Sequence, residues 1–136
     1  MSVIRNLNLR SVMVLSYTTF KYSDLRVNRE KGKDLLVKVR FTVKNTGKYD
    51  GSETAQVYVR PIHPKVERPY KELKGFAKHF IRKNTGQEME ITLDKAAFSY
   101  YKTELKDFDY DAGSYEILVG SASDDIRLRK VIKIEK

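Results

Sequence analysis

The sequence predicts an all-β fold, an antiparallel β-sandwich of about seven strands. Apolar residues recur at every second position in several short runs along the chain. Clusters of Gly, Asn and Asp separate these runs at short intervals, and no segment of useful length has the period of a helix. Short alternating strands with frequent turns are typical of two sheets that pack face to face.

The clearest alternation lies between residues 35 and 59 and predicts two strands. Apolar side chains occupy every second position in two runs: Leu35, Val37, Val39, Phe41 and Val43, then Ala55, Val57 and Val59. A period of two is typical of a strand with one buried face and one solvated face. Asn45-Thr46-Gly47 and Asp50-Gly51 separate the runs with residues that favour turns. We therefore expect the two strands to pair as an antiparallel hairpin.

The other expected elements follow from the same pattern. Further strands are expected over residues 15–27, 73–81, 89–93, 115–119 and 126–134. Gly75 predicts a bulge in the second of these strands. Residues 94–111 are less regular and predict a strand, a loop and a short strand. The prolines between residues 61 and 69 exclude a central strand there and favour an extended surface loop.

Length and composition bound the class of protein. The chain has 136 residues, of which 40% are hydrophobic and 11% aromatic, as in one globular domain. There is no Cys, so disulfides, zinc–thiolate sites and cysteine nucleophiles are excluded. No apolar run reaches the roughly 20 residues that a membrane span needs, and residues 11–15 are too short a run for a signal peptide. The sequence therefore predicts no membrane partner and does not indicate a compartment.

The net charge of +9 raises the question of a nucleic acid partner. Residues 1–49 hold 11 Lys and Arg against 3 Asp and Glu, whereas residues 50–136 hold 16 against 15. Lys38, Arg40 and Lys44 alternate on the solvent face of one expected strand, where lysines also discourage edge-to-edge pairing. We interpret these cations as a solvated strand face and predict no nucleic acid partner. A basic adaptor for polyanions is the weaker alternative.

The chain offers few side chains for chemistry. The candidates are two histidines and two groups of carboxylates: His63, His79, Asp107, Asp109, Asp111, Asp124 and Asp125. The histidines lack metal-ligand spacing, and the alternating aspartates lack the glycine and closing glutamate of a calcium loop. The last two aspartates are interpreted as turn residues that bond turn amides. We therefore predict no catalytic, cofactor-binding or metal-binding residue.

Four segments together resemble one domain of a known enzyme family. They are Leu15–Phe20 with Tyr22-Ser23, Val43–Gly47 with Gly51, Glu53 and Gln56–Val59, Arg68-Pro69 with Lys71–Phe76, and Ala112–Tyr115 with Val119–Ile126. In this order and spacing they resemble the fibronectin type III-like domain at the carboxyl end of family 3 glycoside hydrolases, the β-glucosidases and β-xylosidases. The resemblance covers residues 15–136 and leaves residues 1–14 unmatched.

The resemblance implies a non-catalytic role for this chain. In that family, catalysis belongs to a barrel domain and an α/β domain, neither of which 136 residues could contain. Ser11–Val14 stand where the family has a Phe-Gly-x-Gly run, which suggests a severed reading frame or an excised fragment. We therefore expect an accessory domain whose partners are the catalytic domains of a family 3 glycoside hydrolase.

A severed domain of this kind would expose the apolar surface that once met its partners. The candidate members of this interface are Tyr17, Phe20, Arg68, Pro69 and Tyr70. Association of copies through the same surface would give a homo-oligomer. The alternative reading is a free-standing carbohydrate-binding or protein-interaction module, which a row of exposed aromatic side chains on one sheet would favour.

Overall fold

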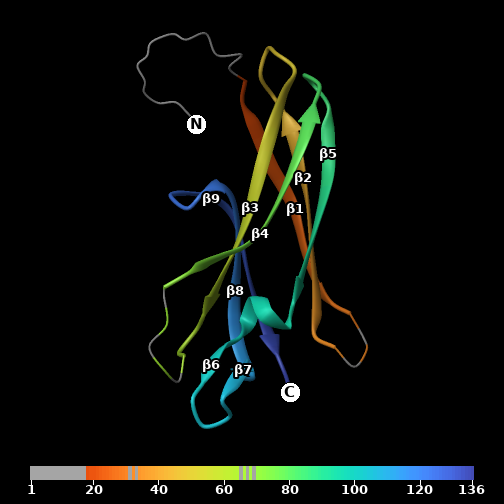
Figure 1. Ribbon diagram of the computed structural model, residues 1–136. Coiled ribbons are helices and arrows are strands. Elements are labelled where there is room, and N and C mark those ends of the chain that lie inside the picture. The colour runs from red at the N-terminus through yellow and green to blue at the C-terminus, as the bar shows by residue number, and fades with distance from the viewer. Residues whose placement is uncertain (1–17, 31, 33, 65, 67, 69) are drawn as a thin grey trace.

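Two antiparallel sheets pack face to face in the computed structural model, which describes residues 18–136 except 31, 33, 65, 67 and 69 (Figure 1). The first sheet has the order β1 (Phe20–Arg29), β2 (Leu36–Asn45), β5 (Gly86–Asp94). The second has the order β4 (Glu72–Ile81), β3 (Gly51–Pro61), β8 (Gly113–Ala122), β9 (Asp125–Ile134). Within the described residues, these seven strands confirm the predicted sandwich.

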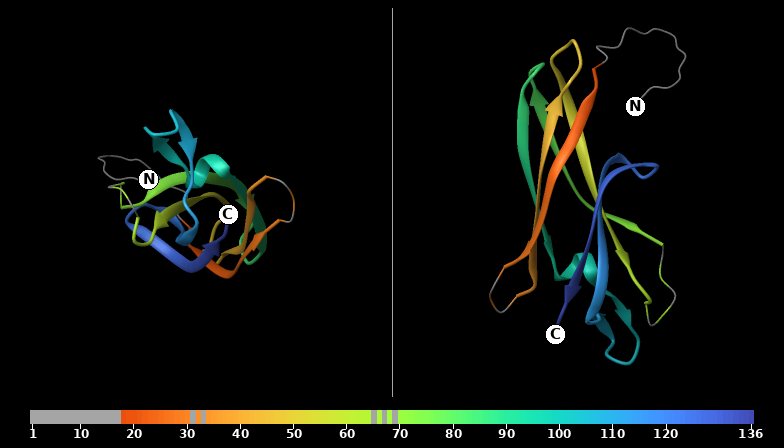
Figure 2. Two further views of the ribbon diagram at one scale, coloured as in Figure 1. Left: turned by 90° about the horizontal axis from the view of Figure 1, so that it is seen from below. Right: turned by 180° about the vertical axis from the view of Figure 1, so that it is seen from behind.

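The irregular segment after β5 contains the predicted strand, loop and short strand, preceded by a helical turn that the sequence did not predict. A short 3-10 helix, η1 (Lys95–Phe98), precedes a small hairpin of β6 (Tyr100–Lys102) and β7 (Asp107–Asp109). A single helical turn is too short to leave a periodic signal, and its cap is local, because the Asp94 carboxylate accepts from the Ala96 amide at 3.1 Å. Figure 2 shows the hairpin projecting away from the two packed sheets. Over the described residues no helix has the length and apolar character needed to cross a membrane.

The predicted hairpin between residues 35 and 59 is wrong. β2 pairs with β1 and β5, whereas β3 pairs with β4 and β8, so the two strands belong to opposite sheets. The alternation correctly identifies their buried faces, since Val39 and Val57 are both fully buried. Those faces meet across the core instead of lying side by side. The turn between the strands therefore carries the chain from one sheet to the other.

The side chain of Asn45 fixes this crossing between the sheets. Asn45 is fully buried at the end of β2. Its amide group donates to the carbonyl oxygens of Tyr49, at 2.8 Å, and Ile81, at 2.9 Å. Its Oδ1 accepts from the Thr18 hydroxyl, at 2.7 Å, and from the Gly47 amide, at 3.0 Å. One side chain thus ties the turn to the start of β1 and the end of β4, with both donors and the acceptor in use.

Close backbone approaches explain two glycines in this framework. A Cβ on Gly47 would lie 1.9 Å from the Thr18 hydroxyl oxygen and 2.6 Å from the Thr19 amide, so no side chain fits there. A Cβ on Gly75 would lie 2.7 Å from a methyl carbon of Ile91 on β5, where the edges of the two sheets approach. The predicted bulge at Gly75 is confirmed by a shift of the β3–β4 register between Val57 and Tyr58.

Replacing Asn45 should destabilise the whole domain. Asn45→Asp keeps the shape but loses both amide donors and places a carboxylate against two carbonyl oxygens. We expect it to lower the free energy of unfolding by about 3 kcal/mol or more, and Asn45→Ala by about 2 kcal/mol. Chemical denaturation measures both losses. Asn28→Asp, at an exposed position of β1, is the matched control, and equal midpoints for Asn28→Asp and Asn45→Asp would contradict the role of Asn45.

Candidate domain interface

Three large apolar side chains stand on the outer face of β4, an edge strand. Leu73, Phe76 and Phe80, here called the β4 strip, are 49%, 69% and 62% exposed. Phe76 lies opposite Gln56 in the register, and the bulge brings Leu73 opposite Tyr58, so these side chains share the outer face. An isolated domain gains nothing from aromatic rings in water, and such exposed apolar groups are typical of a surface that binds a partner.

The apolar surface continues from β4 across the sheet. Tyr58 on β3 and Leu118 on β8 are paired in the register on the same outer face, with 8% and 1% of their surface exposed. Tyr58 alternates with the core residues Val57 and Val59, so it lies on the outer face, but neighbouring side chains cover it. The Lys71 ammonium lies 5.5 Å from the centre of the Tyr58 ring and donates to the Ser123 carbonyl.

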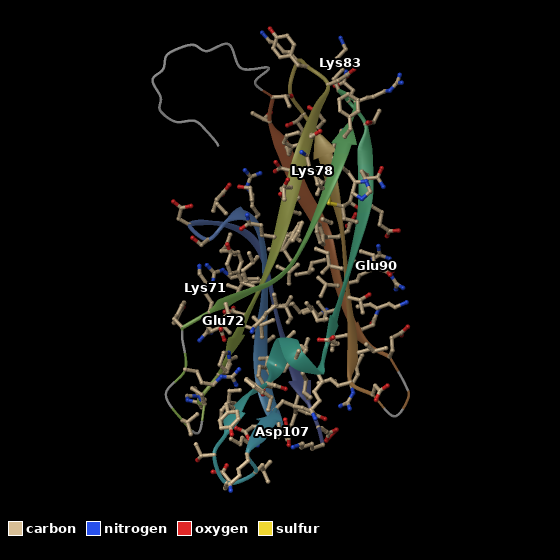
Figure 3. All side chains as sticks on the ribbon, in the orientation of Figure 1. Lys71, Glu72, Lys78, Lys83, Glu90 and Asp107 are labelled. Carbon is tan, nitrogen blue, oxygen red and sulfur yellow. The ribbon has the colours of Figure 1, made fainter. Side chains whose placement is uncertain are left out.

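Cations surround this apolar face. The Arg60 guanidinium lies 5.2 Å from the Tyr70 ring centre and donates to Glu116 at 2.8 Å, and Arg129 approaches the same carboxylate at 3.9 Å. Lys71 immediately precedes β4, and Lys78 lies within it (Figure 3). The cations named here outnumber the one carboxylate named with them, Glu116. A partner whose apolar patch has an acidic rim would therefore complement this face.

A cluster of polar side chains holds the loops at the end of the sandwich near β6 and β7. The Arg68 guanidinium lies 4.8 Å from the Tyr100 ring centre and donates to the Phe98 carbonyl at 3.3 Å. Asp111 accepts from the Tyr100 hydroxyl and from Lys102, both at 2.7 Å. The hydrogen bond with Asp111 raises the pKa of Tyr100 and also that of Lys102. This cluster fixes the hairpin to the β3–β4 loop.

The predicted interface residues do not form one site. Tyr70 is 68% exposed beside Arg60, and Arg68 is half-buried in the loop cluster. Phe20 packs partly against the core at the start of β1, at the other end of the sandwich in Figure 1. Tyr17 and Pro69 lie outside the described residues. The assignment of these five residues to an interface stays a prediction.

Sequence reasoning missed the β4 strip because strand 73–81 has apolar side chains on both faces. One face carries Gly75, Ala77 and Ile81, and the other carries Phe76 and Phe80. The small residues on the first face were the available signal, since they allow close packing inward and leave the large rings outside.

Three of the candidate carboxylates, Asp109, Asp111 and Asp125, are held in ion pairs. Asp125 accepts from Arg127 and from the Ser121 hydroxyl, so the expected bonds to turn amides are wrong for this residue. The Arg127 guanidinium is the main cause that lowers the pKa of Asp125. Lys136 binds Asp109 and lowers the pKa of that carboxyl to about 2. In the described chain, no group of three or more His, Cys, Asp or Glu side chains is placed to hold a metal ion.

The basic strand face is largely neutralised across the first sheet. Arg26 on β1 pairs with Glu88 on β5, and Arg40 on β2 donates to Glu90 at 2.7 Å. Arg40 lowers the pKa of Glu90, which projects from the outer side of β5 (Figure 3). Because Arg26, Lys38 and Arg40 already have carboxylate partners, the polyanion alternative loses part of its support.

One partly buried pair joins two titratable side chains by a hydrogen bond. The Tyr22 hydroxyl donates to Glu53 at 2.8 Å, beneath the Arg127 guanidinium, which lies 5.1 Å from the Tyr22 ring centre. Burial raises the pKa of Glu53, and burial with the nearby Glu53 charge raises the pKa of Tyr22. The described pockets do not include these side chains, and the pair links β1, β3 and β9 across the sandwich.

These features define a β-sandwich with a buried apolar core and an exposed apolar strip on the edge strand β4. The Fibronectin type III-like domain family (Fn3-like) matches residues 53–123, and the chain belongs to this family. Thermostable beta-glucosidase B of Acetivibrio thermocellus is 42% identical over 121 residues, which are 88% of this chain and 16% of the enzyme. The Beta-glucosidase of Kluyveromyces marxianus is 43% identical over 126 residues, 90% of this chain and 14% of the enzyme.

Solved structures agree with the sequence relatives. The GH3 beta-glucosidase of Bifidobacterium adolescentis superposes with a TM-score of 0.82 at 37% identity, covering 90% of this chain and 18% of that one. The predicted resemblance to the fibronectin type III-like domain of family 3 glycoside hydrolases is therefore confirmed. The chain spans less than a fifth of the length of these relatives.

Glu53→Gln should change how stability depends on pH. Because the folded-state pKa of Glu53 is raised, the folded protein holds this proton at pH values where the unfolded chain has lost it. The stability contributed by Glu53 is therefore fully present below its ordinary pKa of 4.5 and falls as pH rises through the raised value. Gln keeps an acceptor for Tyr22 and carries no charge, so the variant should lose less stability over this interval.

Denaturant unfolding at a series of pH values measures this difference. Glu104→Gln, in the exposed turn between β6 and β7, is the control and should parallel the wild-type curve. A Glu53→Gln curve parallel to both would show that burial does not perturb this carboxyl.

Proposed function

We propose that this chain is the non-catalytic accessory domain of a family 3 β-glycosidase and works by packing against the catalytic domains. The observation that carries the proposal is the β4 strip, three large apolar side chains in water on a domain whose core is otherwise complete. The relatives support it, because the chain matches only a small part of each β-glucosidase. The domain hydrolyses nothing by itself.

The apolar side chains of the β4 strip and the cations around it have different roles in docking. Phe76 and Phe80 are the anchors, because aromatic side chains desolvated at the centre of an interface contribute most to binding. Arg60, Lys71 and Lys78 steer the partner and select an acidic rim. Tyr70, beside Arg60, extends this face towards the β3–β4 loop, and Tyr17, Phe20, Arg68 and Pro69 stay predicted members.

The parent enzyme that we propose is a β-glucosidase, the activity named for several relatives. Another relative is an Exo-alpha-(1->6)-L-arabinopyranosidase of Bifidobacterium breve, 37% identical over 121 residues, so this domain accompanies more than one sugar preference. Its role is therefore separable from sugar choice. A homo-oligomer of this chain would use the same strip, and it too stays a prediction.

A domain graft tests the docking role. The matching segment of the Kluyveromyces marxianus Beta-glucosidase is replaced by this chain, and thermal inactivation of aryl glucosidase activity is compared with that of the enzyme lacking the segment. We expect the graft to restore stability that the truncated enzyme loses. Phe76→Ser with Phe80→Ser should weaken docking by about 2 kcal/mol or more and abolish most of this gain.

Two controls make the result specific. Tyr49→Ser removes an aromatic side chain that is 55% exposed at the β2–β3 turn, and it should leave the graft unchanged. The double Phe variant as an isolated chain should unfold at the same denaturant concentration as wild type, because neither ring is in the core. A graft that tolerates both Ser substitutions, or an isolated chain that cleaves the aryl glucoside, would refute the proposal.

A further inference from the structure

An open groove of about 920 Å³ lies between the β6–β7 hairpin, η1 and the start of β4. Its volume is in the range of small-molecule sites. In Figure 3, Glu72 at the start of β4 and Asp107 on β7 mark two of its sides. The groove lies apart from the outward-facing side chains of the β4 strip, which do not line it.

Two aromatic rings form one corner of the groove. Tyr101 and Phe108 are paired across the β6–β7 hairpin, 49% and 58% exposed, and neither belongs to the core. Their ring centres are 5.3 Å apart and their planes meet at 76°. Two aromatic rings nearly at right angles do not form a flat platform. They therefore suit a short ligand made of a few linked rings better than the surface of an insoluble polymer. A ligand ring can stack on one aromatic face and contact the other.

Polar side chains line the groove beside this corner. Arg68 lines the groove, held over the Tyr100 ring and bonded to the carbonyls of Phe98 and Ser99 at 3.3 and 3.5 Å. Tyr100 is itself held by its hydrogen bond to Asp111. These contacts orient the planar guanidinium beside the groove, where its remaining N–H groups can donate to a ligand.

The charges of the lining have both signs. Lys74 lies 3.7 Å from Glu72, and Lys95 and Asp107 also line the groove. An anion would meet two carboxylates there, and a cation would meet three basic side chains. A neutral ligand with many hydroxyl groups can instead donate to the carboxylates and accept from Arg68 and the lysines.

We propose that this groove binds a short neutral oligosaccharide. Aromatic faces take the apolar face of a pyranose ring, and fixed polar groups of both signs take its hydroxyls. The site belongs to the isolated chain and does not depend on docking to catalytic domains. It gives the domain a contact with saccharide that is separate from any catalytic pocket.

The test is an NMR titration of the isotopically labelled chain with cellotriose and with maltotriose. We expect shifts of the backbone amides in β6, β7 and η1 with a dissociation constant of about 1 mM for at least one trisaccharide. Phe108→Ala and Tyr101→Ala should each weaken binding about tenfold. Tyr49→Ala, an equally exposed ring outside the groove, should leave it unchanged.

Each other outcome overturns the proposal. No amide shifts with either sugar would exclude a saccharide site. Shifts that persist in Phe108→Ala and Tyr101→Ala would place binding elsewhere, and tighter binding of a heparin fragment would show an anion site. If these variants disturb only the graft described above, the groove belongs to the protein interface. Failure here with a successful graft rejects the sugar site and leaves the docking role standing.

Discussion

The fold depends on the buried amide of Asn45, which holds two sheets together at the point where the chain passes between them. Four hydrogen bonds converge on this one side chain. They join the start of β1, the turn after β2 and the end of β4, three segments far apart in the sequence. Neighbouring backbone bonds extend the junction, since Thr46 donates to Thr19 and Asn84 donates to Asn45. The motif of Asn, Thr and Gly is therefore a structural joint.

The sequence predicts the faces of the strands better than their partners. Alternation depends only on which side chains meet the core, so it places Val39 and Val57 inside correctly. It carries no information on whether two such strands lie side by side or face each other, and β2 and β3 were therefore paired wrongly. The decisive bonds of Asn45 reach residues 27 and 36 positions away, which no local pattern reveals.

The sequence predicted that a docking surface exists, but not which residues form it. Four motifs indicated an accessory domain and hence a docking surface, but the exposed rings of Phe76 and Phe80 looked like ordinary strand anchors. Their exposure follows from the register, which places both rings on the outer face, whereas Gly75 and Ala77 lie opposite the buried Val57 and Ala55. The groove was equally hidden, because the sequence predicts two short strands there but not the pairing that brings Tyr101 and Phe108 together.

The candidate carboxylates Asp109, Asp111 and Asp125 are held in ion pairs within the domain, whereas the apolar side chains of the β4 strip are exposed. Footprinting with hydroxyl radicals measures this difference most directly, by comparing the isolated chain with the same chain grafted into a β-glucosidase. The account predicts that Leu73, Phe76 and Phe80 are oxidised much more slowly in the graft, while Tyr49 reacts equally in both. Equal oxidation of the β4 strip in the two forms would contradict it.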